Sequence, residues 1–387
     1  MNVAIISHLY PNQRYPGKGT FIRSLHDAIS KRASVEMIVP TVYSFPYTEK
    51  WDYTHAEFLT ANEATRVRYL SFPRGRFPKI TTASLSRAIT RHISKSNYDL
   101  VHVNWLYPDG LAIPKIKSLG IPCVLSIHGS DWYLTQENPE HSNLVRMSLF
   151  QSDAILTVGT RLKKNILKVY PELDGRIHVT YNPVDFNKFQ PDMSRDSALR
   201  TTGWDPRKKH ILCVANIISV KGVDLLLEAF RGLADKNVIL HIIGNVPDTP
   251  YSRSILELIG KTRNVELHAP VSHDEIIPYY HSCDFLVLPS RREGFGLCLA
   301  EAIACGKPVI ATNSGGPEDI VRKENGFLVP TEDEHALREK MELLLSEPFP
   351  YNPKQISMSI QDSFSEKRVT DHLERIYRSA LTNTSRP

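Results

Sequence analysis

Short apolar runs rich in β-branched residues alternate along this chain with longer segments of helical period. Such alternation is typical of a parallel sheet whose strands are joined by crossover helices. One helix is expected over 223–234, with Leu226, Leu227 and Phe230 facing inward. The pattern predicts the α/β class with doubly wound parallel sheets. We place the strands in two series, near 3–7, 35–39, 100–103, 122–127, 154–158 and 177–180, and then near 210–215, 238–243, 265–268, 284–288, 308–312 and 327–329.

A polar, proline-containing stretch, Tyr181 to Asp185, separates the two series and is typical of a hinge between domains. The length of 387 residues supports this division, because single cores rarely grow so large. We expect one domain over 1–183 and a second over 184–364. Residues 365–382 predict an amphipathic helix whose apolar stripe either domain could cover, and we expect it to join the first. The stripe consists of Val369, Leu373, Ile376 and Tyr377.

The composition, 41% hydrophobic and 23% charged, is that of a globular protein and excludes disordered, collagenous and disulfide-scaffold classes. Met1 to Pro11 has neither the basic leader nor the apolar run of a signal peptide, and it predicts a first strand instead. The apolar runs are too short to span a membrane, so we expect a cytoplasmic protein. The five cysteines lie in or beside apolar segments, which indicates reduced core thiols.

The net charge of +5 is unevenly distributed: residues 1–185 carry +7 and the remainder carries −2. A basic and aromatic stretch, Arg66 to Lys79, supplies five of the positive charges. Such a run can lie on an anionic membrane surface, with cations at the headgroups and rings in the interface, so peripheral attachment to the inner face of the membrane is one interpretation. A solvated loop is the other. No nucleic-acid recognition motif accompanies the stretch, so nucleic acid is not an expected partner.

Ligands of doubly wound folds bind beyond the carboxyl ends of the strands. After the 284–288 strand, Glu293 precedes a Gly-Phe-Gly turn that starts at Gly294 and opens a helix at Leu297, and Glu301 follows on that helix. Amides at a helix start attract phosphate, and glycines permit its close approach. Two carboxylates at this spacing can accept hydrogen bonds from sugar and ribose hydroxyls. Alternatively, Glu293 caps the helix and Glu301 is solvated.

A second cluster, Asn216 to Gly222, joins a strand to a helix. Here Lys221 can place its ammonium group on a diphosphate beside the helix start, where it would stabilise a leaving nucleotide. Asn216 is a further candidate for this site, and Arg291 or Arg292 can add positive charge. The alternative is a solvated Lys221.

Three more candidates lie in the first half. His128 and Asp131 follow the 122–127 strand, His102 lies at the end of the 100–103 strand, and Gly17 and Gly19 form a turn before a helix. Packing histidines and a flexible loop are the alternative interpretations. No cluster of His, Cys or Asp has metal-ligand spacing, and no Asp-x-Asp follows a strand, so we expect a metal-independent reaction without a cofactor.

These motifs resemble those of the retaining glycosyltransferases of family 4, enzymes with two Rossmann-like domains in the arrangement called GT-B, and the resemblance covers most of the chain. It implies that Glu293 lies near the transferred sugar and that Glu301 holds the ribose. The turn between them then lies against the sugar and diphosphate of the donor, through Gly294 and the amides of Phe295, Gly296 and Leu297.

The resemblance extends to the remaining candidates. It implies that His128 lies near the anomeric carbon, that Gly17 and Gly19 lie near the donor phosphates, and that His102 and Asp131 are on the acceptor side. The family places an arginine where this chain has Asn216, so Lys221 would supply more of the charge.

The resemblance implies a retaining, metal-independent hexosyltransferase that moves a sugar from a nucleotide diphosphate sugar to an acceptor hydroxyl. It is greatest to bacterial members that assemble cell-wall or surface polysaccharides, such as teichuronic acid or exopolysaccharide glycosyltransferases, which predicts a saccharide or lipid-linked acceptor. Two alternatives stay open: a sugar-nucleotide 2-epimerase of similar architecture, and a catalytically silent sugar-nucleotide binder.

Overall fold

The computed structural model describes residues 1–11, 19–43, 64–71, 77–233, 235, 237–347 and 349–383. The chain divides into two compact units. The first comprises Met1–Pro183 together with Lys367–Pro387, and the second comprises Val184–Glu366.

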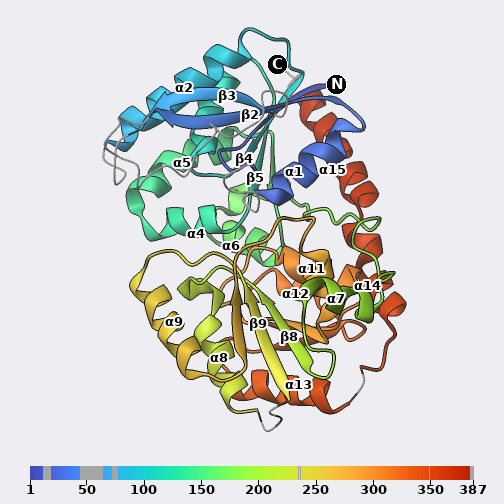
Figure 1. Ribbon diagram of the computed structural model, residues 1–387. Coiled ribbons are helices and arrows are strands. Elements are labelled where there is room, and N and C mark those ends of the chain that lie inside the picture. Colours follow the sequence, from blue (N-terminus) through green and yellow to red (C-terminus); the bar gives the residue numbers. More distant parts are fainter. Residues whose placement is uncertain are drawn as a thin grey trace. The chain divides into compact units, whose positions relative to one another are not determined.

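In the described part of the first unit, seven parallel strands form one sheet in the order β3-β2-β1-β4-β5-β6-β7 (Figure 1). The strands are β1 (Asn2–Ile6), β2 (Ser34–Tyr43), β3 (Thr65–Leu70), β4 (Leu100–Asn104), β5 (Cys123–Ile127), β6 (Ala154–Thr157) and β7 (Ile177–Val179). The helices are α1 (Thr20–Ser30), α2 (Pro78–Ile93), η4 (Asp109–Ala112), α3 (Ile113–Lys117), α4 (Ser130–Glu137), α5 (Pro139–Gln151), α6 (Thr160–Val169), η5 (Pro171–Leu173) and α15 (Glu366–Asn383).

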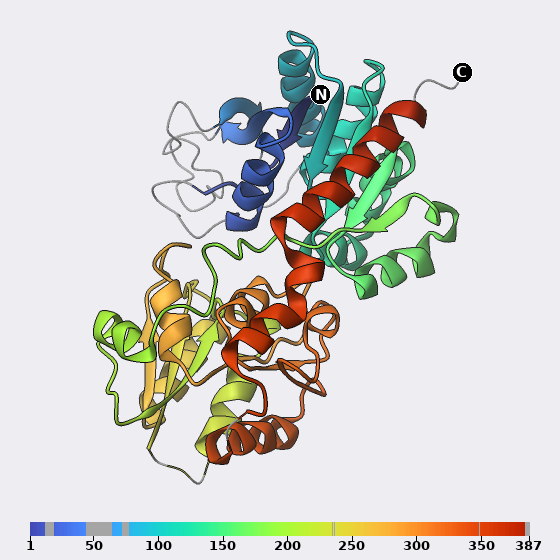
Figure 2. The ribbon, with the colours of Figure 1, turned by 90° about the vertical axis from the view of Figure 1, so that its right-hand side faces the viewer.

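Helix α15 completes the core of the first unit although it comes last in the sequence (Figure 2). Its stripe of Val369, Leu373, Ile376, Tyr377 and Ala380 belongs to the same buried cluster as the apolar face of α1. Each of the five is at most 5% exposed. The amphipathic pattern therefore predicted the helix correctly, and the buried stripe explains why the chain returns to this unit.

Strand β3 was not predicted, because its residues fall in the basic and aromatic stretch. Arg66 and Arg68 are exposed whereas Val67 and Tyr69 are buried, the alternation of a half-buried edge strand. Tyr69 is only 6% exposed, so its ring is not available to a membrane interface, contrary to that interpretation of the stretch. Arg74 and Arg76 lie outside the described residues.

The second unit contains a six-stranded parallel sheet, within the described residues, in the order β10-β9-β8-β11-β12-β13 (Figure 1). The strands are β8 (Lys209–Val214), β9 (Val238–Ile243), β10 (Val265–His268), β11 (Phe285–Leu288), β12 (Val309–Thr312) and β13 (Gly326–Val329). The helices are α7 (Arg195–Thr202), η6 (Ser219–Lys221), α8 (Val223–Arg231), α9 (Pro250–Lys261), α10 (Ile277–Ser282), α11 (Leu297–Ala304), α12 (Pro317–Ile320), α13 (Glu334–Ser346) and α14 (Pro353–Phe364).

The doubly wound α/β fold is confirmed in both units, and each of the twelve predicted strands has an observed counterpart. In each sheet the strand order reverses once, between β1 and β4 in the first unit and between β8 and β11 in the second. Crevices at such reversals are where open α/β sheets bind ligands. Within the described ranges, no helix is both long and apolar enough to cross a membrane.

Candidate functional site

Lys221 and Glu293 meet beyond the carboxyl ends of the two strands that flank the reversal in the second unit. Lys221 ends η6 after β8, and Glu293 follows β11. The Nζ of Lys221 donates to Oε2 of Glu293 at 2.6 Å, and the Oγ of Ser290 donates to the same oxygen at 3.0 Å. Although burial opposes it, the contact with Glu293 raises the pKa of Lys221. The ammonium group therefore stays charged at neutral pH.

Two close backbone approaches hold this site together. A Cβ on Gly222 would lie 2.1 Å from the carbonyl oxygen of Pro289, and one on Gly316 would lie 2.3 Å from the Cα of Phe295. The backbone of Glu293 also bonds the turn after β12, through its N to Ser314 O at 3.0 Å and its O from Gly316 N at 2.9 Å. The turn at 314–318 therefore packs directly against the backbone of Glu293.

Helix α11 begins at Leu297 after Gly296, whose φ of 94° lies in the left-handed region. A glycine adopts this conformation without the strain that a Cβ would cause. The first amides of a helix have no intrahelical acceptor, so they are directed toward the space before the helix. The Glu293–Leu297 segment thus combines a carboxylate with a helix start, as the sequence predicted.

The other two residues of this turn differ in exposure. Gly294 forms a bend directly after Glu293 and is partly exposed, whereas Phe295 is only 3% exposed. The Phe295 ring lies 5.5 Å from that of Phe364 by centroid, so its side chain packs in the core and leaves only its backbone to a ligand. The contact of Gly294 with the donor stays a prediction.

Arg291 has a different position from the one predicted. Its guanidinium bonds both oxygens of Asp224, at 2.8 and 2.7 Å, and also pairs with Glu332. These carboxylates accept the hydrogen bonds of the guanidinium N–H groups that were expected to contact a diphosphate. Arg291 instead holds the η6 loop, through its Nη1 to Ser219 O at 2.7 Å and its backbone N to Val220 O at 2.9 Å. It therefore positions the loop that carries Lys221.

Glu301 is 5% exposed on α11, and both of its oxygens are hydrogen-bonded. His273 Nε2 lies 2.7 Å from Oε1, and the Tyr280 hydroxyl donates to Oε2 at 2.6 Å. Lys188 Nζ lies 3.2 Å from His273 Nδ1, so this nitrogen accepts and Nε2 carries the proton donated to Glu301. A ligand hydroxyl at Glu301 would share oxygens already held by His273 and Tyr280. Neither of these partners was predicted from the sequence.

Asn216, which stands where the family has an arginine, is exposed at the end of β8. Its Oδ1 accepts from the backbone N and the Nδ2 of Asn245, at 3.0 and 3.1 Å. The side chain therefore joins the loops that follow β8 and β9, and it contributes no positive charge.

The candidate residues of the first unit gather after β4 and β5. His128 Nε2 lies 3.2 Å from Asn104 Oδ1, and its ring lies 4.5 Å from Trp105 and 5.0 Å from Phe21 by centroid. Burial lowers the pKa of His128 to about 3, so the ring is neutral at physiological pH. Asp131 is 2% exposed. A neutral His128 is suited to hydrogen bonding of a substrate rather than to charge stabilisation.

Asp131 organises the backbone around His128. Its Oδ1 accepts from the amides of His128 and Gly129, at 3.0 and 2.9 Å, and its Oδ2 accepts from Leu106 N at 2.7 Å. Burial raises the pKa of Asp131 to about 6, while the backbone hydrogen bonds oppose that rise. The predicted acceptor-side contact is therefore replaced by a structural role, because three amides already surround the carboxylate.

His102 is also corrected by the structure. It is 0% exposed, with Nδ1 2.6 Å from the Tyr377 hydroxyl of α15 and Nε2 2.7 Å from Ser126 Oγ. A side chain enclosed in this way does not contact an acceptor. Gly19 precedes α1 with a φ of 70°, and a Cβ there would lie 2.8 Å from Leu9 O. Gly17 lies outside the described residues.

A further pair in the first unit, His8 and Asp109, was not predicted from the sequence. His8 follows β1, and its Nδ1 and its backbone N both lie 2.8 Å from Oδ2 of the fully buried Asp109. The His8 ring lies 5.5 Å from that of Trp105 by centroid. Asp109 comes 101 residues later in the sequence, so no local spacing reveals the pair.

The two units match two models of known families. Residues 17–188 match Glycosyltransferase Family 4, and residues 194–361 match Glycosyl transferases group 1. An uncharacterized glycosyltransferase of Methanocaldococcus jannaschii is 25% identical over 378 residues, which cover 96% of this chain and 98% of that protein. The D-inositol 3-phosphate glycosyltransferase of Thermobifida fusca is 28% identical over 286 residues, covering 68% of this chain and 64% of that protein.

Solved structures show the same architecture. The sucrose-phosphate synthase of Thermosynechococcus elongatus has a TM-score of 0.82 at 19% identity, over 99% of this chain and all of that one. The Anabaena protein HepE in complex with UDP-glucose has a TM-score of 0.75 at 16% identity, over 98% of this chain and all of that one. The two Rossmann-like sheets and these matches define a glycosyltransferase with the GT-B fold. Within that class, the matches support the family 4 type, with the family 4 and group 1 models matched in succession.

Proposed function

We propose that this chain transfers a hexose from a nucleotide diphosphate sugar to an acceptor hydroxyl, with retention of configuration at the anomeric carbon. The observation that carries the proposal is the Lys221–Glu293 pair beside the start of α11. The Lys221 ammonium group and the first amides of α11 can bind a diphosphate, and the Glu293 carboxylate can accept hydrogen bonds from the sugar attached to it.

Lys221 and the amides of the 294–297 turn stabilise the charge that develops on the leaving diphosphate. As the bond between the anomeric carbon and the phosphate oxygen breaks, the acceptor oxygen bonds that carbon on the same face. The acceptor proton passes to the departing phosphate oxygen. Glu293 and the neutral His128 orient the sugar, and Glu301 holds the ribose. No metal ion or cofactor is required for these steps.

One structural neighbour was solved with UDP-glucose, which supports this donor class. One relative is named as a D-inositol 3-phosphate glycosyltransferase, and that name concerns the acceptor. For the acceptor we propose a saccharide or lipid-linked saccharide of cell-wall or surface polysaccharide synthesis, reached by a cytoplasmic enzyme peripheral to the membrane. The positive charge of the first 185 residues and the exposed Arg66 and Arg68 on the edge strand β3 support an anionic acceptor surface.

The test is release of nucleoside diphosphate from a panel of nucleotide sugars, with inositol phosphate, malate and lipid-linked saccharides as acceptors. We expect release that depends on an acceptor, a product whose anomeric proton coupling matches the donor, and loss of at least tenfold in turnover for Glu293→Gln. The matched exposed variant Glu228→Gln should keep wild-type turnover.

Other outcomes overturn the proposal. Conversion of the nucleotide sugar alone into another nucleotide sugar would identify an epimerase. Binding without release across the whole panel would identify a silent binder, the outcome that the loss of the family arginine at Asn216 would explain. A product of inverted configuration would contradict retention.

A further inference from the structure

Two residues of the edge strand β10 and one of its neighbour β9 place metal-ligand atoms on one face of the second unit's sheet. Glu266 and His268 are two positions apart on β10, and side chains at that spacing project to the same face. The parallel register pairs Glu266 with His241 of β9. The sequence expectation that no cluster had metal-ligand spacing missed this group, because strand pairing rather than local spacing creates it.

The three atoms form a compact triangle. His241 Nδ1 lies 3.0 Å from His268 Nε2 and 3.3 Å from Glu266 Oε2, and the third side, between His268 Nε2 and Glu266 Oε2, is 3.7 Å. Zinc bonds to nitrogen and carboxylate oxygen are about 2.0–2.2 Å, so ligand atoms in a tetrahedral site lie about 3.4 Å apart. The observed sides bracket that value, and one ion equidistant from the three atoms would have bonds of the normal length.

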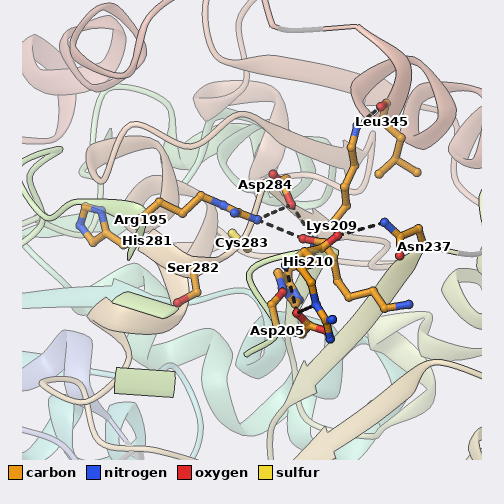
Figure 3. Close-up of polar contacts among 12 residues, drawn as sticks. Arg195, Asp205, Lys209, His210, Asn237, His281, Ser282, Cys283, Asp284 and Leu345 are labelled. Carbon is orange, nitrogen blue, oxygen red and sulfur yellow. Dashed lines mark hydrogen bonds and ion pairs between the residues drawn. The ribbon is translucent and has the colours of Figure 1, made fainter. Parts of the chain in front are cut away.

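A chain of hydrogen bonds determines which ring nitrogen of His241 carries no proton. His210 Nε2 lies 2.9 Å from the carbonyl oxygen of Asp205, which only accepts, so this nitrogen carries the proton (Figure 3). In the neutral ring the Nδ1 of His210 is then an acceptor, and it lies 3.0 Å from His241 Nε2. His241 therefore donates through Nε2 and presents the lone pair of Nδ1 to Glu266 and His268. A ligating histidine held through its other nitrogen is the usual arrangement at metal sites.

The site combines a rigid interior ligand with two accessible ones. The His241 ring stacks on Trp204 at 3.5 Å between centroids and 9° between planes, and its side chain is 1% exposed. The side chains of His268 and Glu266 are 25% and 52% exposed. An ion can therefore reach the triangle from solvent without displacing the core, and a fourth position stays on the solvent side.

We propose that His241, Glu266 and His268 bind one divalent transition-metal ion, with zinc as the best fit and water as the fourth ligand. Two imidazoles and one carboxylate match zinc and its neighbours in the first transition series, whereas magnesium and calcium prefer oxygen ligands. The site is separate from the transfer steps proposed above, none of which uses these residues. Without an ion, the same atoms would form only a hydrogen bond between the two rings beside a solvated carboxylate.

The test uses the full chain after treatment with chelator, titrated with Zn²⁺ by calorimetry and with Co²⁺ by visible absorption. We expect one saturable site per chain and Co²⁺ bands of the intensity typical of four-coordinate nitrogen and oxygen ligation. Glu266→Gln and His268→Gln should each weaken binding at least tenfold and remove those bands. Both side chains are partly exposed, so thermal unfolding should show that the variants fold.

Matched controls separate this site from general surface binding. Glu228→Gln and His335→Gln alter exposed groups on α8 and α13 and should bind Zn²⁺ as the wild type does. An excess of Mg²⁺ or Ca²⁺ should not compete. The proposal is overturned if the wild type shows no saturable site, or if the Glu266 and His268 variants bind with wild-type affinity.

Discussion

Histidines of the first unit show how the same residue type acquires different roles. Burial lowers the pKa of His102 to about 3, and the ring is enclosed by Ser126 and by Tyr377. The sequence placed His102 at the end of a strand but could not show that Tyr377, 275 residues later, would close over it. His128 keeps the position beyond β5 that its motif predicted. Partners from distant segments therefore decide between packing and ligand contact.

This burial predicts a specific dependence of stability on pH. The pKa of His102 is lower in the folded chain than the ordinary 6.5, so the unfolded chain binds an extra proton below that pH. Keeping His102 neutral costs the folded chain no stability above pH 6.5. As the pH falls from 6.5 toward 3, the free energy of unfolding decreases by about 1.4 kcal/mol per pH unit. Thermal unfolding of wild type and His102→Gln between pH 7.5 and 5 should show their stability difference shrinking as the pH falls.

The exposed His335→Gln should unfold at the wild-type temperature at pH 7.5. Parallel stability curves for wild type and His102→Gln would show that His102 is not held neutral by the fold.

At the scale of elements, strands predicted from apolar runs were found, and β3 was missed because charged residues occupy its exposed positions. In β4 and β5 every residue is buried, so these strands appear in the sequence as mainly apolar runs, whereas β3 alternates exposed arginines with buried Val67 and Tyr69. The glycine turn after Glu293 was predicted from the sequence. How closely the backbone of the 314–318 turn approaches it was not, because such a distance depends on tertiary packing.

That approach makes Gly316 a test of how the 293–297 turn is positioned. A Cβ in Gly316→Ala would meet Cα, C and O of Phe295 within 2.6 Å, so the backbone must shift. We expect affinity for a nucleoside diphosphate to fall at least tenfold and the melting temperature to fall as well. The control is Gly260→Ala in α9, where a Cβ meets nothing within 4 Å and helix propensity gains about 1 kcal/mol. Wild-type affinity in Gly316→Ala would contradict the positioning role.

At the scale of the whole molecule, the two-sheet fold followed from the sequence, whereas net charge did not indicate which unit holds the candidate donor site. The candidate donor site lies in the half whose net charge is −2, because Lys221 and the helix amides provide a local positive region. The Arg291–Asp224 and His241–Glu266 contacts could be found only in the three-dimensional structure. The first joins residues 67 apart, and the second joins adjacent strands. Motifs thus predicted a candidate site, and tertiary contacts determined which of its side chains are available.

We propose that a nucleoside diphosphate binds at Lys221, and calorimetric titration with UDP, GDP and ADP measures this binding. We predict saturable one-to-one binding that is strongest for one of the three nucleotides. Lys221→Ala should weaken it at least tenfold, since a hydrogen bond to a charged group contributes about 1.5–3 kcal/mol. The matched variant Lys323→Ala, whose side chain is 83% exposed in the wild type, should bind normally. No binding of any of the three, or equal binding by wild type and Lys221→Ala, would contradict the claim.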